Sequence, residues 1–427
     1  MFVKNIKLSN FKSFKEIDVD LINFNVLIGA NASGKSNFTK AFRFLKNVEK
    51  EGLENAVSLG GGIENLQNIH LADSSEMQIN FTWFDVAKWL ATDKKDARSV
   101  SLDLLEYSLS LGFKEFGQEF FVLNEKFTET LRIHSLVEGK KDEYTVGDKV
   151  AKGQIHISRT SEGANVKYSN ESFESFTKNK RIMPDIESSL SRFGFLDNKD
   201  TATRPLLLET PYLFMPPQFS LASKTGLYDI DPALARLHAP IAGKTELEED
   251  GSNLALVLRE IVKDKEKKRK LVNLLQDVLP FVNDINAKKS VEKAVMLTVK
   301  EEYYEDKSLP SDLLSDGTIN IVALIVALYF EEQDIVIIEE PERNIHPSLI
   351  SSVVNMMKDA SSRKQIIVTT HSPIVVKHAG VDNLLFVSRD YNGYSHISRP
   401  NQQEDLKIFM ENDLGLDEIY IQNLFRE

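Results

Sequence analysis

The stretch "GANASGKS", from Gly29 to Ser36, constrains this chain more than any other because it matches the pattern G-x-x-x-x-G-K-[ST]. The apolar run "FNVLIG" before it predicts a strand, and from Lys35 onward the apolar residues recur at helical spacing. In a strand, loop and helix of this kind, the loop amides and the helix N-terminus surround phosphate oxygens. The alternative is a glycine-rich turn that only caps a helix, but the flanking strand and helix favour the phosphate loop. We therefore predict a nucleoside triphosphate site.

Each residue type in this loop has a physical role at such a site. The glycines let backbone amides curl around phosphate, Lys35 supplies positive potential, and Ser36 is a ligand for Mg²⁺. The predicted nucleotide-binding residues of the segment are Gly29, Ala30, Asn31, Ala32, Ser33, Gly34, Lys35, Ser36 and Asn37.

A second motif, "IVIIEEPERNIHP" from Ile335 to Pro347, ends a fully apolar strand on two adjacent glutamates. Such a strand is buried on both faces, and a phosphate loop needs a neighbouring strand that delivers a carboxylate to the magnesium ion. We assign Glu339 to the metal and Glu340 to the general base that activates the attacking water. The alternative is that both are solvated glutamates at a strand end.

Two further segments carry candidate site residues. "IIVTTHSP" ends a third apolar strand on His371, where an imidazole is placed to hydrogen-bond the γ-phosphate. A lone histidine at a strand end is more often structural, but its order after the acid pair favours the functional interpretation. "LLSDGTINIVALIVALYF" places Ser315 and Gly317 just before an apolar, buried helix, whose free N-terminal amides predict an anion site separate from the phosphate loop.

The pattern along the chain predicts an α/β protein with a parallel sheet core, an antiparallel β lobe and a helical insertion. Alternating runs predict the β lobe over about 77–168. A mainly helical insertion is expected over 169–289, with one long polar helix through "NLALVLREIVKDKEKKRKLVNLLQDVLP". An ATPase head would then consist of 1–168 and 290–427, closing with strands and then a short docking helix or two over 404–425.

Composition limits the class of protein. The 427 residues are 42% hydrophobic, as in a soluble globular protein. The longest apolar stretch is far shorter than the roughly 20 residues that span a bilayer, and the N-terminus lacks a signal-peptide pattern. The absence of cysteine fits a reducing compartment. We therefore expect a cytoplasmic protein without a membrane partner, and the net charge of −12 argues against a uniformly basic nucleic-acid binder.

Taken in order, "GANASGKS", "LSDGT", "IVIIEEPERNIHP" and "TTHSP" resemble the Walker A, signature, Walker B with D-loop, and H-loop motifs of ABC-type ATPase heads. The chain is most similar to the RecF/OLD-like group of predicted AAA family ATPases. Further agreement comes from "IKLSNFKSFKEIDVDL", "EEDGSNLALVLREI" and "LGLDEIYIQNLF". The region from about Ala87 to Leu247 is not covered by the resemblance.

The resemblance implies ATP and Mg²⁺ as ligands and a head-to-tail homodimer, or a higher oligomer, with two shared sites. Ser315 and Gly317 would contact the γ-phosphate of the other subunit's ATP. Lys12 falls where related heads often carry a basic residue near the nucleotide, and either Gln67 or Gln78 would be the Q-loop glutamine.

The chain departs from the usual motifs in three places. Glu339 replaces the usual Walker B aspartate, which keeps the carboxylate and lengthens its reach by one methylene. The signature "LSDGT" lacks the second glycine and the final glutamine of transporter subunits, so a transporter is disfavoured. His346, before Pro347, either begins the next helix or faces the partner subunit.

The sequence also bears on two other activities, nuclease activity and nucleic-acid binding. OLD-type nucleases carry a Toprim domain after the H-loop, and the 56 residues that follow His371 are too few to hold one, so a nuclease would be a separate chain. The hypothesis that the chain binds DNA or RNA depends on a basic segment. Because acidic residues are interleaved in this segment, the default interpretation is a solvated helix face. The basic residues are Lys263, Lys265, Lys267, Lys268, Arg269, Lys270, Lys288 and Lys289.

These patterns predict an ATP-hydrolysing, dimerising switch. The group to which the resemblance points suggests a motor or sensor subunit of a bacterial anti-phage defence or DNA-transaction complex with a separate effector protein. Two alternatives stay open at this point: a RecF-like ATPase that binds DNA during repair, and a scaffold that binds ATP without hydrolysing it.

Overall fold

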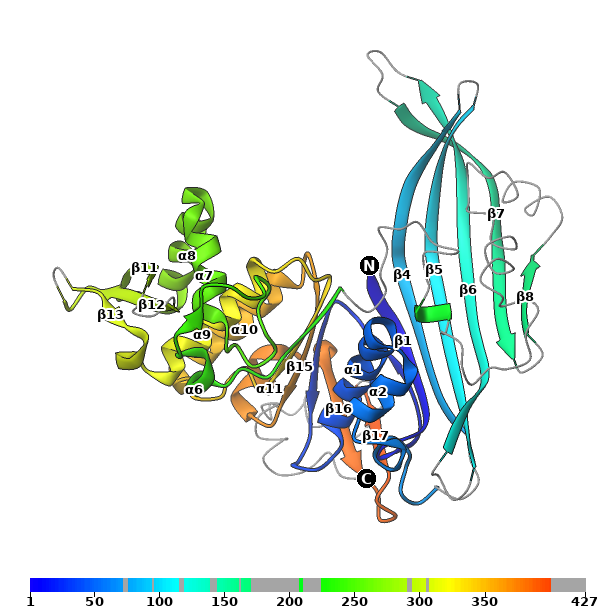
Figure 1. The fold of residues 1–427 in the computed structure, drawn as a ribbon, viewed down its shortest axis with the longest axis horizontal. Coiled ribbons are helices and arrows are strands. Elements are labelled where there is room, and N and C mark those ends of the chain that lie inside the picture. Colours follow the sequence, from blue (N-terminus) through cyan, green and yellow to red (C-terminus); the bar gives the residue numbers. More distant parts are fainter. Residues whose placement is uncertain are drawn as a thin grey trace, which may run out of the picture. The chain divides into compact units, whose positions relative to one another are not determined.

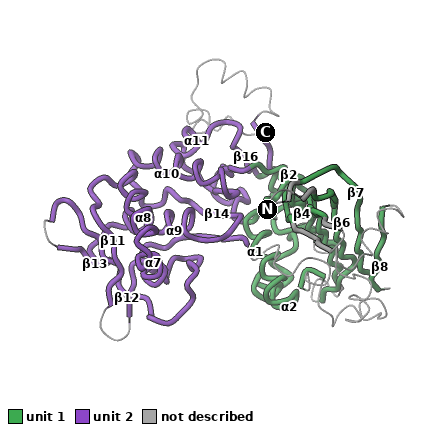
Figure 2. The backbone as a smooth tube through the Cα atoms, turned by 90° about the horizontal axis from the view of Figure 1, so that it is seen from above, with its two compact units in different colours: residues 1–22, 37–223, 389–396 green, residues 23–36, 224–388, 397–427 purple. Residues whose placement is uncertain are grey.

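The computed structural model describes residues 1–71, 76–93, 96–114, 119–138, 144–160, 163–169, 207–209, 224–289, 294–304 and 307–400. The chain divides into two compact units, drawn in green and purple in Figure 2. Unit 1 consists of 1–22, 37–223 and 389–396, and unit 2 consists of 23–36, 224–388 and 397–427. The docking helices expected over 404–425 lie outside the described residues.

Unit 1 contains a seven-stranded antiparallel sheet in the order β2-β1-β4-β5-β6-β7-β8, whose long curved strands are seen in Figure 1. Its strands are β1 (Phe2–Phe11), β2 (Phe14–Asp20), β4 (Met77–Asp93), β5 (Asp96–Lys114), β6 (Glu119–Glu138), β7 (Tyr144–Thr160) and β8 (Gly163–Tyr168). Alternating side chains face opposite sides of such a sheet. In β1, for example, Ile6 and Leu8 are buried while Lys7 between them is exposed.

Helices cover part of this sheet. They are α1 (Lys35–Glu51), α2 (Leu53–Leu59) and α3 (Ile63–Leu66), and a short 3-10 turn, η2 (Leu207–Glu209), belongs to the same unit. Phe42 of α1 packs edge-on against Phe81 of β4, with ring centroids 5.2 Å apart. The helical spacing of apolar residues after the phosphate loop is therefore explained by burial of one face of α1 against the sheet.

Unit 2 is built around a six-stranded sheet in the order β17-β16-β3-β15-β14-β9. Strands β16, β3, β15, β14 and β9 run parallel to one another. The strand bounds are β3 (Phe24–Ile28), β9 (Thr225–Tyr228), β14 (Ile335–Glu339), β15 (Gln365–Thr370), β16 (Leu384–Arg389) and β17 (Ser395–Ser398). Parallel strands are buried on both faces, which explains their continuous apolar sequences.

Helices pack around this sheet in one hydrophobic core. They are α6 (Pro232–Ala235), α7 (Leu254–Lys263), α8 (Lys265–Val278), α9 (Asp316–Tyr329), α10 (Pro347–Ala360) and α11 (Pro373–Ala379). Helix α9 is buried along almost its whole length, so its apolar residues extend all round the helix. The 3-10 turns of the unit are η5 (Ser311–Leu313) and η6 (Val381–Asn383).

A smaller antiparallel sheet completes unit 2. It pairs β10 (Ala239–Pro240), β12 (Ala294–Glu301) and β11 (Val282–Lys289), and β13 (Leu309–Pro310) pairs with β12. Val295, Leu297 and Val299 of β12 are buried in the core that the helices share. This sheet was not predicted from the sequence.

The α/β class, with a parallel sheet core and an antiparallel β lobe, is confirmed, and the antiparallel sheet also includes β1 and β2. The single long helix expected after Asn253 is wrong, because two helices meet at Asp264. The carboxylate of Asp264 accepts hydrogen bonds from the backbone amides of Glu266 and Lys267 and so caps the start of α8. The division into a head and an insertion at 169–289 stays a prediction, since 170–206 and 210–223 lie outside the described residues.

No helix in the described ranges is both long enough and apolar enough to cross a membrane.

Candidate active site

The phosphate loop connects β3 to α1 in the predicted place. Ala32 and Gly34 have positive φ angles of 61° and 118°, which bends the backbone so that successive amides face a common concavity. The ammonium group of Lys35 donates hydrogen bonds to the carbonyl oxygens of Gly29 (2.7 Å) and Ala30 (3.0 Å). Lys35 is thus folded back over its own loop, where a phosphate group can replace the two carbonyl oxygens.

The environment of Lys35 is that of a partly desolvated cation. Burial lowers the pKa of its ammonium group, while the nearby carboxylates of Glu340, Glu342 and Glu339 act in the opposite direction.

The first glycine of the loop, Gly29, is required for packing. A Cβ atom on Gly29 would lie 2.2 Å from the backbone oxygen of Val387, closer than any real contact.

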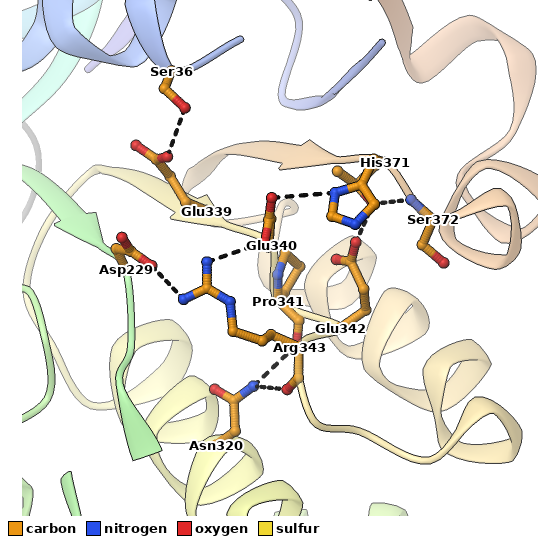
Figure 3. A network of polar contacts seen from close by, with 11 residues as sticks. Ser36, Asp229, Asn320, Glu339, Glu340, Pro341, Glu342, Arg343, His371 and Ser372 are labelled. Carbon is orange, nitrogen blue, oxygen red and sulfur yellow. Dashed lines mark hydrogen bonds and ion pairs between the residues drawn. The ribbon is translucent and has the colours of Figure 1, made fainter. Parts of the chain in front are cut away.

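The two expected metal ligands lie together. The hydroxyl of Ser36 donates a hydrogen bond of 3.1 Å to Oε2 of Glu339 (Figure 3). Strand β15 lies between β3 and β14 and runs parallel to both, so the carboxyl ends of all three strands meet at one edge of the sheet. That arrangement brings together residues that are 303 positions apart. Two hard oxygen ligands beside a phosphate site fit the preference of Mg²⁺, which is usually bound by one or two protein groups together with phosphate.

Glu340 follows the last residue of β14 and has a backbone φ of 46°, an unusual value for a residue with a Cβ atom. Its backbone N–H donates to the carbonyl of Thr369 in β15. Oε1 of its carboxylate lies 3.2 Å from Nδ1 of His371, and Oε2 lies 3.0 Å from Nη2 of Arg343. Because a carboxylate only accepts hydrogen bonds, Nδ1 of His371 is the donor in this pair, and Nε2 remains for another partner.

Glu342 was not predicted as a site residue, although it stands in the same motif. Its side chain is largely buried, accepts a hydrogen bond from the hydroxyl of Thr370, and has a pKa raised by that burial. The hydroxyl of Thr370 in turn accepts from the backbone N–H of Ser372 at 2.9 Å. Glu342 therefore ties the turn after β14 to the segment that carries His371 (Figure 3).

Arg343 and Asn320 were also missed. Nη1 of Arg343 lies 3.0 Å from the carboxylate of Asp229, which follows β9. The side-chain amide of Asn320, buried in α9, donates to the backbone oxygens of Arg343 (2.7 Å) and Pro341 (3.3 Å). Helix α9, which carries the signature segment at its start, is thereby fastened to the turn that carries Glu340.

The signature segment begins α9 as predicted. Ser315 is its N-cap, and its hydroxyl accepts from the backbone N–H of Thr318 at 3.1 Å. A Cβ atom on Gly317 would lie 2.6 Å from the backbone oxygen of Asn344, so only glycine allows this close approach. Ser315, Gly317, Asn344 and His346 line a cavity of about 400 Å³ within unit 2. His346 caps α10, because its Nδ1 accepts from the N–H of Ser348.

Two predicted nucleotide contacts, Lys12 and Asn37, belong to unit 1. Lys12 donates to the carbonyl of Asn65 at 2.7 Å, and its pKa is lowered to about 8 by burial and by the neighbouring Lys40. The side-chain amide of Asn37 donates to the hydroxyl of Ser13 at 2.8 Å.

The candidate Q-loop glutamines also lie in unit 1. Gln67 is buried and pairs with Phe11 in a β-bridge, and within the described part of the chain its Nε2 has no hydrogen-bond partner. Gln78 lies in β4 and contacts the carboxylate of Glu76. Their role at the nucleotide, like that of Lys12, stays a prediction.

Three of the cations on α8 contact neighbouring side chains. Lys268 pairs with Asp284 at 2.8 Å, Arg269 pairs with Glu266 at 2.7 Å, and Lys270 lies over the rings of Tyr329 and Phe330. This arrangement favours the expected solvated helix face over a nucleic-acid surface.

A family model described as the AAA ATPase domain matches residues 1–376. The chain belongs to this family of AAA ATPases. It follows that the chain is an ATPase.

This AAA ATPase matches curated relatives over short stretches. It is 43% identical over 54 residues to endonuclease GajA of Bacillus cereus (strain VD045), which is 12% of this chain and 9% of that protein. It is 46% identical over 46 residues to the DNA replication and repair protein RecF of Streptococcus agalactiae serotype Ia, which is 10% of this chain and 12% of RecF. The chain thus spans only about a tenth of the length of these relatives.

Among solved structures, the AAA ATPase is similar to an Smc head domain with an extended coiled coil from Pyrococcus furiosus, bound to the C-terminal domain of ScpA. The two are 12% identical with a TM-score of 0.49, and the match covers 97% of this chain and 100% of that chain.

Proposed function

We propose that the chain binds ATP with Mg²⁺ at the phosphate loop, hydrolyses it with Glu340 as general base, and dimerises head to tail around the nucleotide. One observation supports this most strongly: the loop that carries Lys35, the Ser36–Glu339 pair and the Glu340–His371 pair all occur at the carboxyl edge of one parallel sheet. Ligands of open parallel sheets bind at that edge.

The individual roles follow from the contacts. Lys35 would release the carbonyls of Gly29 and Ala30 and donate to phosphate oxygens instead. Ser36 and Glu339 would hold Mg²⁺, which supplies charge neutralisation at the β- and γ-phosphates. Glu340 would take a proton from the attacking water, and His371, whose Nδ1 donates to Glu340, would in its doubly protonated form donate from Nε2 to the γ-phosphate.

The composite site can be tested by mixing two inactive chains. Lys35→Ala damages the phosphate loop, and Ser315→Arg damages the signature segment that would act on the partner's ATP. Each variant alone should be inactive. In a mixed dimer one site collects both lesions and the other is intact, so random exchange should restore about a quarter of the wild-type ATPase rate. Differently tagged chains confirm the exchange, and a rate that stays at zero in confirmed mixed dimers would contradict independently firing shared sites.

For the biological role, we propose a motor or sensor subunit of a bacterial anti-phage defence or DNA-transaction complex with a separate effector protein. The similarity to endonuclease GajA supports a link to nucleic-acid chemistry. Isolation of tagged protein from its native host with Glu340→Gln, which should hold the ATP-bound dimer, tests this. A stoichiometric second protein is expected, and recovery of the homodimer alone in the presence of ATP would contradict an effector-coupled subunit.

A RecF-like ATPase that binds DNA is the second candidate, favoured by the similarity to RecF. The two candidates differ in how DNA affects ATP turnover. An effector-coupled switch should turn over ATP at the same rate with and without DNA, whereas a RecF-like protein should be stimulated by DNA. If no turnover is found under either condition, the third alternative, a scaffold that binds ATP without hydrolysing it, is supported.

A further inference from the structure

A chain of ion pairs leads away from the proposed general base. His371, Glu340, Arg343 and Asp229 follow one another with contacts of 3.2, 3.0 and 3.0 Å, as Figure 3 shows. His371 and Arg343 bind different oxygens of the Glu340 carboxylate. One donor would still let the carboxylate rotate about its last side-chain bond. Two donors on two oxygens fix the plane of the carboxylate.

The backbone around Arg343 is held as firmly as its side chain. Its N–H donates to the carbonyl of Glu340 at 2.9 Å, and its own carbonyl accepts from the buried amide of Asn320. Glu340 itself stands in a left-handed backbone conformation, which sets the direction in which its side chain leaves the strand. The guanidinium and the carboxylate therefore meet in a turn whose backbone is fixed at both ends.

The position of Asp229 follows from sheet register. Strand β9 pairs in parallel with β14, and Tyr228 is level with Ile338. Asp229, the next residue, therefore lies beside the end of β14, where Glu339 and Glu340 leave the sheet. One nitrogen of the planar guanidinium binds Asp229 and the other binds Glu340, and a lysine has no second nitrogen with which to do this.

We propose that Arg343 is a positioning residue for the proposed hydrolysis: oriented by Asp229, it holds the carboxylate of Glu340 in the direction from which it accepts a proton from water. This inference rests on the proposed function. Arg343 touches neither the nucleotide nor the water in this arrangement and acts only through Glu340.

The ion pairs contribute little to stability, so a change in activity in the variants should not result from unfolding of the protein. About half of the Asp229 side chain and two-fifths of the Arg343 side chain are exposed, with relative accessibilities of 51% and 42%. Exposed pairs of this kind contribute little to the free energy of unfolding. Substitution of either residue should leave the protein folded.

The experiment compares Arg343→Gln, Arg343→Lys and Asp229→Asn with wild type in steady-state ATPase assays. Arg343→Gln should lower kcat by about tenfold, as expected for a misaligned reacting group, with unchanged ATP affinity by calorimetry. Arg343→Lys should recover only part of the rate. Asp229→Asn, which removes only the group that orients Arg343, should lower kcat by a smaller factor, again with unchanged ATP affinity.

A double variant and a control separate positioning from general damage. Because Asp229 acts through Arg343, the double variant Asp229→Asn/Arg343→Gln should have the kcat of Arg343→Gln alone. Lys244→Ala breaks a comparably exposed pair with Glu248 in the same unit and should leave kcat unchanged.

Two results would overturn the proposal: an unchanged or increased kcat in Arg343→Gln, or additive losses in the double variant. Glu340→Gln distinguishes this failure from failure of the proposed function. If Glu340→Gln abolishes turnover while Arg343→Gln does not, only the positioning role is wrong. If Glu340→Gln turns over ATP within a few-fold of wild type, the general-base assignment falls with it.

Discussion

Glu129, on β6 of unit 1, is a buried carboxyl group in an apolar setting. Its side chain is 1% exposed, and within the described part of the chain neither oxygen has a hydrogen-bond partner. Its cross-strand neighbours are Leu105 on β5 and Ile155 on β7. Burial raises the pKa of Glu129 from 4.5 to about 8. The group is therefore expected to be protonated in the folded protein at neutral pH and ionised in the unfolded chain.

The sign of the effect on stability follows from proton binding. Between about pH 4.5 and pH 8 the folded state holds a proton that the unfolded state has lost, so stability falls as the pH rises through this range. Because the pKa of Glu129 rises from 4.5 to about 8, the buried carboxyl group lowers the free energy of unfolding. This loss has an upper limit of about 5 kcal/mol above pH 8 and is about 1 kcal/mol at pH 5. Glu129→Gln keeps the shape and cannot ionise. The stability of the variant relative to wild type should therefore grow by up to about 4 kcal/mol from pH 5 to pH 9.

Glu125, four residues earlier on the same strand, provides a matched contrast. It is also fully buried, but its carboxylate accepts from the N–H groups of Leu207 and Leu208 and from the hydroxyl of Tyr107, and Arg159 lies 3.6 Å away. These groups offset part of the desolvation, and the pKa of Glu125 rises only to about 7. Glu125→Gln should destabilise the protein by about 1–3 kcal/mol, because an amide has one accepting oxygen and cannot accept all the hydrogen bonds that Leu207, Leu208 and Tyr107 donate to the two carboxylate oxygens.

The assay is urea-induced unfolding of the two variants and wild type at pH 5, 7 and 9, followed by circular dichroism. We expect Glu129→Gln to gain on wild type as the pH rises and Glu125→Gln to be less stable than wild type at pH 7. If the difference between Glu129→Gln and wild type stays constant within 1 kcal/mol over the whole range, then Glu129 does not titrate as its burial implies.

Three further predictions concern the site in unit 2. Gly317→Ala should destabilise the protein by about 1–3 kcal/mol, since its Cβ would overlap the backbone of Asn344, and a melting curve measures this. Asn320→Ala should cost about 1–3 kcal/mol by leaving the buried carbonyls of the Glu340 turn without their donor, and an unchanged melting temperature would argue against that contact. Chelation of Mg²⁺ should abolish ATP turnover, and Glu339→Ala should raise the Mg²⁺ concentration required for half-maximal rate by more than tenfold, as read from metal titrations at fixed ATP.

The sequence predicted those parts of the site whose chemistry depends on local order. The phosphate loop must follow a strand and begin a helix, and the apolar strand that ends on Glu339 and Glu340 must be buried in a parallel sheet. Parallel neighbours then bring their carboxyl ends to one edge whatever the length of chain between them, which is why Ser36 and Glu339 meet across 303 positions. Their closeness was predictable without knowing the order of the other strands.

The rest depended on pairing that the sequence does not display. Asp229 reaches Arg343 only because the four-residue strand β9 pairs with β14 at the sheet edge, and "TGLY" has neither the length nor the alternation that marks a strand. Asn320 lies in a helix that is apolar on all sides, so its polarity stands out in the sequence, but its partners are backbone oxygens that have no sequence signature. Both residues act on the turn that carries Glu340. The motif therefore specifies which residue is the base, whereas strand order and helix packing determine how that base is held.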